Sequence, residues 1–449
     1  MQFQKNIYIY KSQISATLKL AVPVIIGQLG QVMMSMVDSL MVGHLGAVPL
    51  AAAALANSVF FLVLVFGIGV SQSLTPLVAE SVGAGLPHRC GSLLKHALLV
   101  NTGTGIILTV ISFGTAALIP FLNQPAAIIP QAVAYLHIMG ISVIPVMLFL
   151  TYRQYSEGLS LMWPAMILTL GANILNVLLN WIFIHGHFGF PAMGLTGAGL
   201  STLLTRIVMT ILLIVYVHKA SAYRMYRAPI FFRPIVFDWK MIRNLIRIGY
   251  GTGLQYFFEV GAFSGAAVMI GWMGAKYLAA HQIALSCASF SFMFAIGVSA
   301  AAAIRVGQAK GEKNIVAMRR AGFSAFFMAA LIMFSFGILF ILFRFTIPHF
   351  FISDPEVIQL AASIIIFAAL FQVSDGLQSA GLGVLRGMGD VRVPTMATFA
   401  SYWLIGLPGG YLLAFPLGLK IWGVWIGLFL GLTSSAIILT TRFHLKTKE

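Results

Sequence analysis

Twelve long apolar segments constrain what this chain can fold into. A helix rises ~1.5 Å per residue, so roughly 20 apolar residues cover the ~30 Å hydrocarbon core of a bilayer. Only 8% of the 449 residues are charged, whereas a soluble domain carries about 25%. The sequence therefore predicts an all-α polytopic membrane protein. Its twelve predicted spans are 14–41, 50–79, 93–119, 131–151, 163–185, 194–217, 244–272, 277–303, 319–343, 357–382, 395–415 and 420–441.

The basic residues predict the orientation of these spans. Lysine and arginine gather at the N-terminus, in alternate loops and in the tail, and this set includes Arg153 and Arg386. The opposite loops hold only Lys276, Arg344 and Lys420. Because cytoplasmic loops are enriched in basic residues, we expect both termini in the cytoplasm of a bacterial inner membrane. The same loops account for the net charge of +16 without a nucleic-acid partner, and no obligate protein partner is expected.

An internal repeat divides the chain into two lobes. The segment Met41-Val-Gly-His-Leu-Gly-Ala47 in the first half resembles Met269-Ile-Gly-Trp-Met-Gly-Ala275 in the second. Each half begins and ends on the same side, so the two repeats run parallel about an axis along the membrane normal. We therefore predict an N-terminal six-helix lobe (1–217), a basic cytoplasmic connector (218–243) and a C-terminal six-helix lobe (244–449). The N-terminal segment shows no cleavage pattern of a signal peptide, so the first helix is expected to be retained.

Three acidic residues lie inside apolar spans, and their charges need compensation. The other eight are assigned to loops, helix ends or the tail: Glu80, Glu157, Asp238, Glu312, Asp354, Glu356, Asp390 and Glu449. Asp38, Glu259 and Asp375 remain, and a carboxylate at such depth costs a few kcal/mol. Only Arg206 lies clearly mid-span among the basic residues, and it cannot pair with all three. We expect a mobile cation to balance them, although a buried arginine or a polar packing network would be the structural alternative.

Asp38 has polar neighbours in its own half. Asn176 and Asn180 are one helical turn apart, so they share a face, and Thr202 lies on the next span. A carboxylate with amide and hydroxyl oxygens suits Na⁺, or a proton shared through hydrogen bonds. Hydrogen bonding between helices is the alternative. Pro23 and Gly27 precede Asp38 on the same helix and predict a bend, which we assign as a hinge.

Glu259 and Asp375 are set among aromatic and amide side chains. Gln255 and Tyr256 precede Glu259 by about one turn, and Phe371 precedes Asp375 by one turn. An apolar wall disfavours the charged form of a carboxylate and brings its proton exchange toward the physiological range. It also attracts hydrophobic cations through charge and ring faces together. Glu259 and Asp375 are therefore candidates for binding a coupling ion. The candidates for binding a cationic solute are these two carboxylates together with Gln255, Tyr256, Phe371 and Asp38.

The sequence carries no sign of an enzyme. No GxxxxGK[ST] phosphate loop, serine nucleophile elbow or HExxH helix is present. The two cysteines, Cys90 and Cys287, are too few for a disulfide framework or a thiolate cluster. We expect transport driven by an ion gradient, with no cofactor other than the coupling ion.

The ordered set of these motifs resembles the MATE family, the multidrug and toxic compound extrusion transporters, and within it the NorM-like bacterial branch. The resemblance covers essentially the whole chain. It rests on the two six-helix lobes and on these segments: Val37 to Gly43, Pro76 to Gly85, Tyr155-Ser-Glu157-Gly158 with Pro164, Asn176 to Asn180, Glu259, Asp375, and Arg386-Gly-Met-Gly-Asp390 with Pro394.

The resemblance implies a V-shaped antiporter that expels cationic amphipathic drugs in exchange for Na⁺ or H⁺. Asp38, Asn176 and Asn180 would correspond to the cation network of the N-lobe, and Glu259 and Asp375 to the acidic pair of the C-lobe. Two positions depart from the family pattern. Phe371 stands where some members have a tyrosine, which weakens the case for Na⁺ there, and Glu80 stands where glutamine is common. A flippase for lipid-linked precursors and a passive channel are the alternatives.

Overall fold

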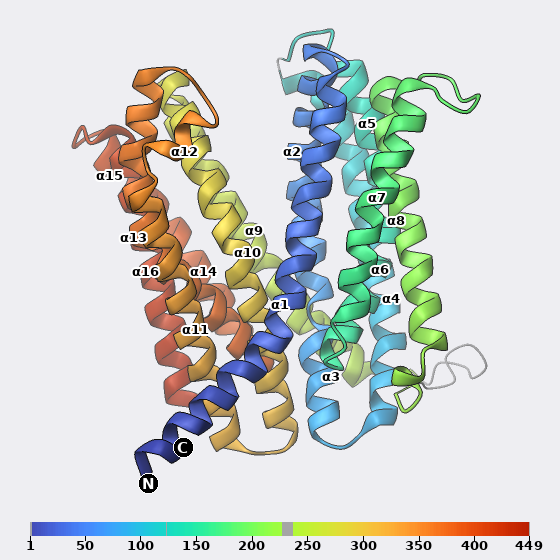
Figure 1. The fold of residues 1–449 in the computed structure, drawn as a ribbon, viewed down its shortest axis with the longest axis vertical. Helices are drawn as coiled ribbons and strands as arrows, with labels where there is room; N and C mark the ends of the chain where they lie inside the picture. The colour runs from blue at the N-terminus through green and yellow to red at the C-terminus, as the bar shows by residue number, and fades with distance from the viewer. Residues whose placement is uncertain (1, 123, 227–236, 449) are drawn as a thin grey trace. The chain divides into compact units, whose positions relative to one another are not determined.

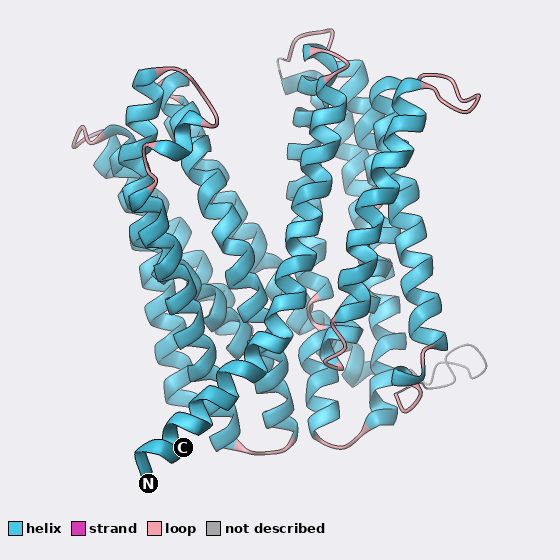
Figure 2. Ribbon diagram, viewed as in Figure 1, coloured by secondary structure: helices cyan, strands magenta, loops and turns pink. Residues whose placement is uncertain are grey.

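The described part of the chain consists of helices joined by loops and turns. The computed structural model describes residues 2–122, 124–226 and 237–448, and within these ranges it contains no β-strand (Figure 2). The predicted connector, 218–243, falls partly on residues 227–236, which lie outside the described ranges together with Arg227 and Arg233. The all-α fold class is confirmed.

The helices of the first half, labelled as in Figure 1, are α1 (Gln2–Gly43), α2 (Ala47–Ser71), α3 (Leu74–Gly83), α4 (Pro87–Leu118), α5 (Ile129–Ile141), α6 (Val143–Gly158), α7 (Trp163–His185) and α8 (Gly194–Lys219). Those of the second half are α9 (Trp239–Gly271), α10 (Ala275–Gly311), α11 (Ile315–Leu342), α12 (Thr346–His349), α13 (Pro355–Gly387), α14 (Arg392–Phe399), α15 (Leu407–Ala414) and α16 (Lys420–Lys446).

Eleven helical stretches in the described ranges are long and apolar enough to cross a membrane. Two of them join consecutive α-helices, since α2 runs on into α3 and α5 into α6. The remaining predicted span, 395–415, is helical too, but a π-helical segment at Ala400–Gly406 divides it into α14 and α15. Such segments arise where one extra residue is inserted into a helical turn. The multi-span prediction therefore holds, with one span interrupted.

The chain packs into two compact units. The N-unit comprises Ile26–Gly253, and the C-unit comprises the residues up to Ile25 together with Leu254–Glu449. The divisions thus fall inside α1 and α9. The sequence division into 1–217, 218–243 and 244–449 concerns the duplication, and it stays a prediction.

Backbone turns recur at the spacing of the internal repeat. Gly46 and Gly274 precede α2 and α10 with φ of 118° and 120°, and their separation along the chain equals that of Met41 and Met269. Gly85 and Lys313 have φ of 68° and 54° and show the same separation. Positive φ is costly for residues other than glycine, so Lys313 holds a conformation that the repeated turn imposes. The two units therefore use the same connections between their helices.

The points inside α1 and α9 at which the chain passes from one unit to the other are also separated by the spacing of the internal repeat. Ile25 and Gly253, after which the chain passes from one unit to the other, have the same separation as the repeated glycines. In the N-unit, a Cβ on Gly69 would lie 2.5 Å from the Cα of Gly253, so α2 and α9 touch backbone to backbone. In the C-unit, a Cβ on Gly297 would lie 2.3 Å from Cγ1 of Ile25. Small residues allow this close approach of membrane helices. The first half of α1 thus packs with the C-unit, and the first half of α9 with the N-unit.

Candidate functional site

Asp38 is held by two neighbouring helices of the N-unit. Asn180 Nδ2 on α7 donates a hydrogen bond to Asp38 Oδ1 at 2.6 Å, and Thr202 Oγ1 on α8 donates to Oδ2 at 3.3 Å. Asn180 Nδ2 also donates to Asn176 Oδ1 at 3.2 Å. The structure therefore brings together all four residues that the sequence proposed for this site.

The asparagines keep unused hydrogen-bonding capacity. Asn176 and Asn180 are fully buried, yet Asn180 Oδ1 and Asn176 Nδ2 have no hydrogen-bond partner in the described structure. Most buried polar atoms are paired, so such atoms need an explanation. Asn180 Oδ1 is an acceptor beside a carboxylate, which is the type of oxygen that a hard cation binds. The arrangement suits a small cation or a proton, and its role stays a prediction.

Arg206 lies one turn after Thr202 on α8, close enough to act electrostatically on Asp38. Its guanidinium donates to Ser142 Oγ at 2.5 Å and stands over the ring of Phe60, 5.3 Å from the centroid. Within the described ranges Asp38 forms no ion pair. Arg206 therefore supplies a nearby positive charge but does not occupy the Asp38 carboxylate as an ion-pair partner.

Glu259 lies at the centre of a polar cluster in the C-unit. It is 7% exposed, and Gln378 Nε2 on α13 donates to its Oε1 at 3.4 Å. The Tyr402 hydroxyl, from the π-helical segment, donates to Gln378 Oε1 at 2.9 Å and also reaches the Glu259 carboxylate. Asp375 is 5% exposed and interacts electrostatically with Glu259. The predicted acidic pair is thus a pair in space.

A cavity opens beside Glu259. The side chains that line it come from α9, α10 and α13: Gln255, Tyr256, Glu259, Phe292, Ser299, Gln378, Ser379, Leu382 and Arg386. Two of the aromatic and amide residues proposed from the sequence, Gln255 and Tyr256, are among them. Phe371 is not, because its ring stacks on Trp425 with the centroids 5.5 Å apart. Asp375 does not line the cavity either, and it acts on the site through its charge.

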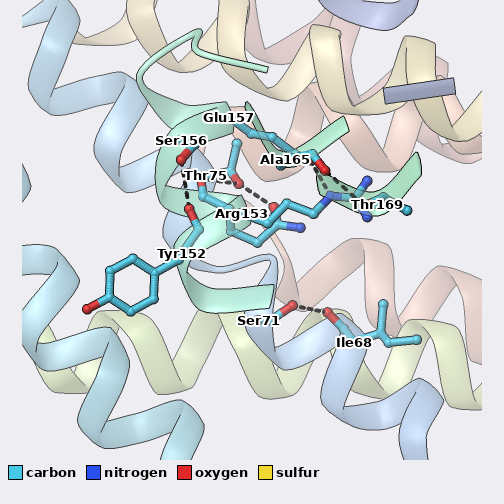
Figure 3. A network of polar contacts seen from close by, with 10 residues as sticks. Ile68, Ser71, Thr75, Tyr152, Arg153, Ser156, Glu157, Ala165 and Thr169 are labelled. Atoms are coloured by element: carbon cyan, nitrogen blue, oxygen red, sulfur yellow. Dashed lines mark hydrogen bonds and ion pairs between the residues drawn. The ribbon is translucent and has the colours of Figure 1, made fainter. Parts of the chain in front are cut away.

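Two predicted loop residues are buried instead, and this prediction was wrong. Arg153 Nε donates to Glu157 Oε1 at 2.7 Å, and both side chains are at most 7% exposed (Figure 3). The physical reason is that α6 continues to Gly158 while packing against α3, α4 and α8, so the loop begins later than the fall in hydropathy indicates. Thr75 on α3 adds a hydrogen bond to the carbonyl of Gln154.

Arg386 is a second correction to the loop assignments. It lies in the last turn of α13, is 6% exposed and lines the cavity with Glu259. The sequence placed it in a cytoplasmic loop because the predicted span ended at residue 382. Sequence reasoning also missed Gln378 and Tyr402. Gln378 could have been found from its spacing, because it lies three residues after Asp375 on the same helix. No feature of the sequence around Tyr402 indicates its position beside Glu259.

The predicted hinge lies at the division between the units. Pro23 is inside α1, where its ring removes one helical hydrogen bond. Gly27 has no atom within 4 Å of where a Cβ would be, so its surface is open. The break after Ile25 falls between these two residues. The hinge role itself stays a prediction.

Comparison with known proteins decides the family. The MatE family pattern matches residues 23–182 and 252–412, one segment in each half. The chain belongs to the MatE family. Among its relatives, a probable multidrug resistance protein NorM from Mesorhizobium japonicum is 36% identical over 97% of this chain and 94% of that protein. The multidrug resistance protein NorM of Vibrio cholerae is 32% identical over 98% and 97%.

Solved structures share the MatE fold. The eukaryotic MATE transporter AtDTX14 has a TM-score of 0.86 and 20% identity, with 97% of this chain and 96% of that chain covered. An outward-facing multidrug resistance MATE transporter of the MOP superfamily has a TM-score of 0.88 and 19% identity at the same coverage. At such identities the likeness shows the fold alone, whereas the family pattern and the NorM relatives confirm the resemblance that the sequence motifs predicted for this MatE protein.

Proposed function

We propose that this protein is a secondary active multidrug efflux antiporter that exports cationic amphipathic compounds in exchange for Na⁺ or H⁺. The observation that carries the proposal is that Asp38, Glu259 and Asp375 are carboxylates inside helices, and none forms an ion pair within the described ranges. Relatives at 32–36% identity are named multidrug resistance proteins, which supports this substrate class.

The Asp38 site is suited to exchange an ion. Asn180 and Thr202 donate to both oxygens of the carboxylate, so they stabilise its charged form. A proton or Na⁺ bound there would compete with these donors and change the contacts between α1 and α7. Because α1 continues through Pro23 into the C-unit, a rearrangement at Asp38 has a direct mechanical path along one helix.

The Glu259 cavity is suited to bind the exported compound. Tyr256 and Phe292 give ring faces, and Glu259 gives a negative charge that an amphipathic cation would neutralise. Antiport requires that substrate and coupling ion bind the two conformations with different affinities. Competition of both for the same acidic residues meets this requirement without direct ATP coupling.

We further propose a bacterial inner-membrane location with both termini in the cytoplasm. Two sets of ion pairs support the predicted sidedness. Lys276, in a predicted outer loop, pairs with Asp354 and Glu356 at the N-terminal end of α13, which the predicted topology assigns to the same side. Asp390, in a predicted cytoplasmic loop, pairs with Arg442 and Lys446 of the tail. Each set joins segments that the topology assigns to one side of the membrane.

Dye efflux from energised vesicles tests the proposal. At fixed pH, with sodium present or absent, an imposed Na⁺ or H⁺ gradient should concentrate an ethidium-type dye against its own gradient. The variant Asp38→Asn and the double variant Glu259→Gln/Asp375→Asn should both lose this activity. Equilibration without concentration would indicate a passive channel, and transport only of lipid-linked phosphates would indicate a flippase. Intact gradient-driven efflux in both variants would refute the mechanism.

A further inference from the structure

The cavity that holds Glu259 also holds a buried positive charge. We propose that Arg386 fixes the charge balance of the acidic pair, so that one monovalent cation at a time neutralises the C-unit site. This inference rests on the proposed antiport function and concerns which substrates that site takes. It follows from three observations: where Arg386 lies, what it contacts, and how many charges surround it.

Arg386 lies on the same face of α13 as the residues that contact Glu259. Gln378, Leu382 and Arg386 follow one another at four-residue intervals, and all three line the cavity. Side chains on a helix lean toward its N-terminus. The guanidinium of Arg386 is therefore directed along the cavity wall toward Gln378, whose amide donates to Glu259.

The guanidinium has no anionic partner of its own. Arg386 is 6% exposed, and its guanidinium makes no hydrogen bond or ion pair with any residue in the described ranges. The nearest acid in the sequence, Asp390, is bound by Arg442 at 2.7 Å and Lys446 at 2.8 Å. The C-terminus of α13 offers about half a negative charge. A full positive charge needs more than this. Glu259 lines the same cavity as Arg386, and Asp375 lies outside the lining but interacts electrostatically with Glu259.

The charges of the site then leave one negative charge unbalanced. Glu259 and Asp375 contribute two negative charges when ionised, and Arg386 contributes one positive charge. A single proton, Na⁺ or monocationic compound makes the site neutral, whereas a dication would leave it positive. Without Arg386 the site would need two positive charges. Arg386 therefore acts as a specificity-determining residue that favours monocations and a one-for-one exchange.

Two dyes with the same aromatic core test this. Ethidium carries one positive charge and propidium two, so their transport ratio reports charge preference. In proteoliposomes with the full chain, Arg386→Gln should raise the propidium-to-ethidium ratio about tenfold, because the site would then carry the two negative charges that a dication neutralises; a tenfold change corresponds to about 1.4 kcal/mol. Arg386→Lys should keep the original ratio. Arg392→Gln, which removes an exposed charge outside the cavity, is the matched control.

A second variant separates charge balance from a structural role. Asp375→Asn/Arg386→Gln restores a single negative charge, so its dye ratio should return toward that of the unmodified protein. Arg386→Gln with an unchanged ratio, or a double variant that keeps the altered ratio, would overturn the inference while gradient-driven ethidium efflux persists in the unmodified protein. Absence of that efflux would overturn the proposed function itself, and with it the inference.

Discussion

Asn180 donates a 2.6 Å hydrogen bond to Asp38 and so joins α7 to α1 within the N-unit. It is the shorter of the two hydrogen bonds that the carboxylate accepts from side chains. A hydrogen bond to a charged group contributes about 1.5–3 kcal/mol. The contact is therefore strong enough to determine how readily Asp38 exchanges its cation.

Replacing this amide should impair transport while leaving the fold intact. We expect Asn180→Ala to lower gradient-driven dye efflux roughly tenfold or more, since about 1.4 kcal/mol corresponds to a factor of ten. Asn173→Ala is the matched control, because Asn173 lies on the same helix but donates to the carbonyl of Thr169 in its own helix. Efflux rates should be compared at equal amounts of folded protein, and equal losses in both variants would contradict a specific role.

The buried pair of Arg153 and Glu157 should matter for stability. Removing one partner leaves a buried charge without compensation, which typically costs about 3–5 kcal/mol. We expect Glu157→Gln to lower the thermal unfolding temperature of the purified protein clearly, and Arg153→Met/Glu157→Met to recover much of the loss.

The exposed pair of Lys276 and Glu356 provides the control for that experiment. Lys276→Ala should leave the unfolding temperature unchanged, because solvent screens exposed ion pairs. Similar losses at the exposed and the buried pair would show that burial does not govern the effect.

Gly69 and Gly253 lie so close together that adding a side chain at Gly69 should destabilise the protein. A Cβ on Gly69 would lie 2.5 Å from the Cα of Gly253. Gly69→Ala must push α2 and α9 apart, at a cost of roughly 1–3 kcal/mol. Gly103→Ala, where no atom lies within 4 Å of the new Cβ, should be neutral or slightly stabilising. Unfolding temperatures of the two variants give the comparison, and equal temperatures would contradict the close packing.

The loop carboxylate Asp390 should make stability depend on pH. Burial alone would raise the pKa of Asp390, but hydrogen bonds and charges from Arg442 and Lys446 outweigh burial and hold this pKa below its usual value. A lowered pKa in the folded state stabilises the protein above the unfolded value of about 3.9. This stabilisation is lost as the pH falls through the folded pKa. The unfolding temperature should therefore exceed that of Asp390→Asn at pH 7. The difference should begin to shrink at about pH 4 and should vanish once the pH falls below the folded pKa of Asp390. A difference that grows in acid would contradict this.

The sequence predicted the features that follow from local pattern. The spacing of Asn176 and Asn180 placed both amides on one helical face, and the depth of Asp38 in an apolar span made them its partners. Tyr402 could not be predicted in this way, because only the π-helical segment and the packing of α13 bring it to Glu259. Arg153 and Arg386 were wrongly predicted to lie in loops for a related reason. A charged residue near the end of a helix has the sequence pattern of a loop residue, and only the packing partners of that helix end show that it is buried.

The central claim is that substrate and coupling ion exchange on the same carboxylates, and counterflow tests it directly. Proteoliposomes holding the protein receive a monocationic dye on one side, with no ion gradient imposed, and sodium and pH are recorded on the other side. We predict that dye entry drives Na⁺ or H⁺ in the opposite direction, and that Asp38→Asn and Glu259→Gln/Asp375→Asn each abolish this ion movement. Dye transport without ion movement, or ion movement unchanged in both variants, would contradict the account.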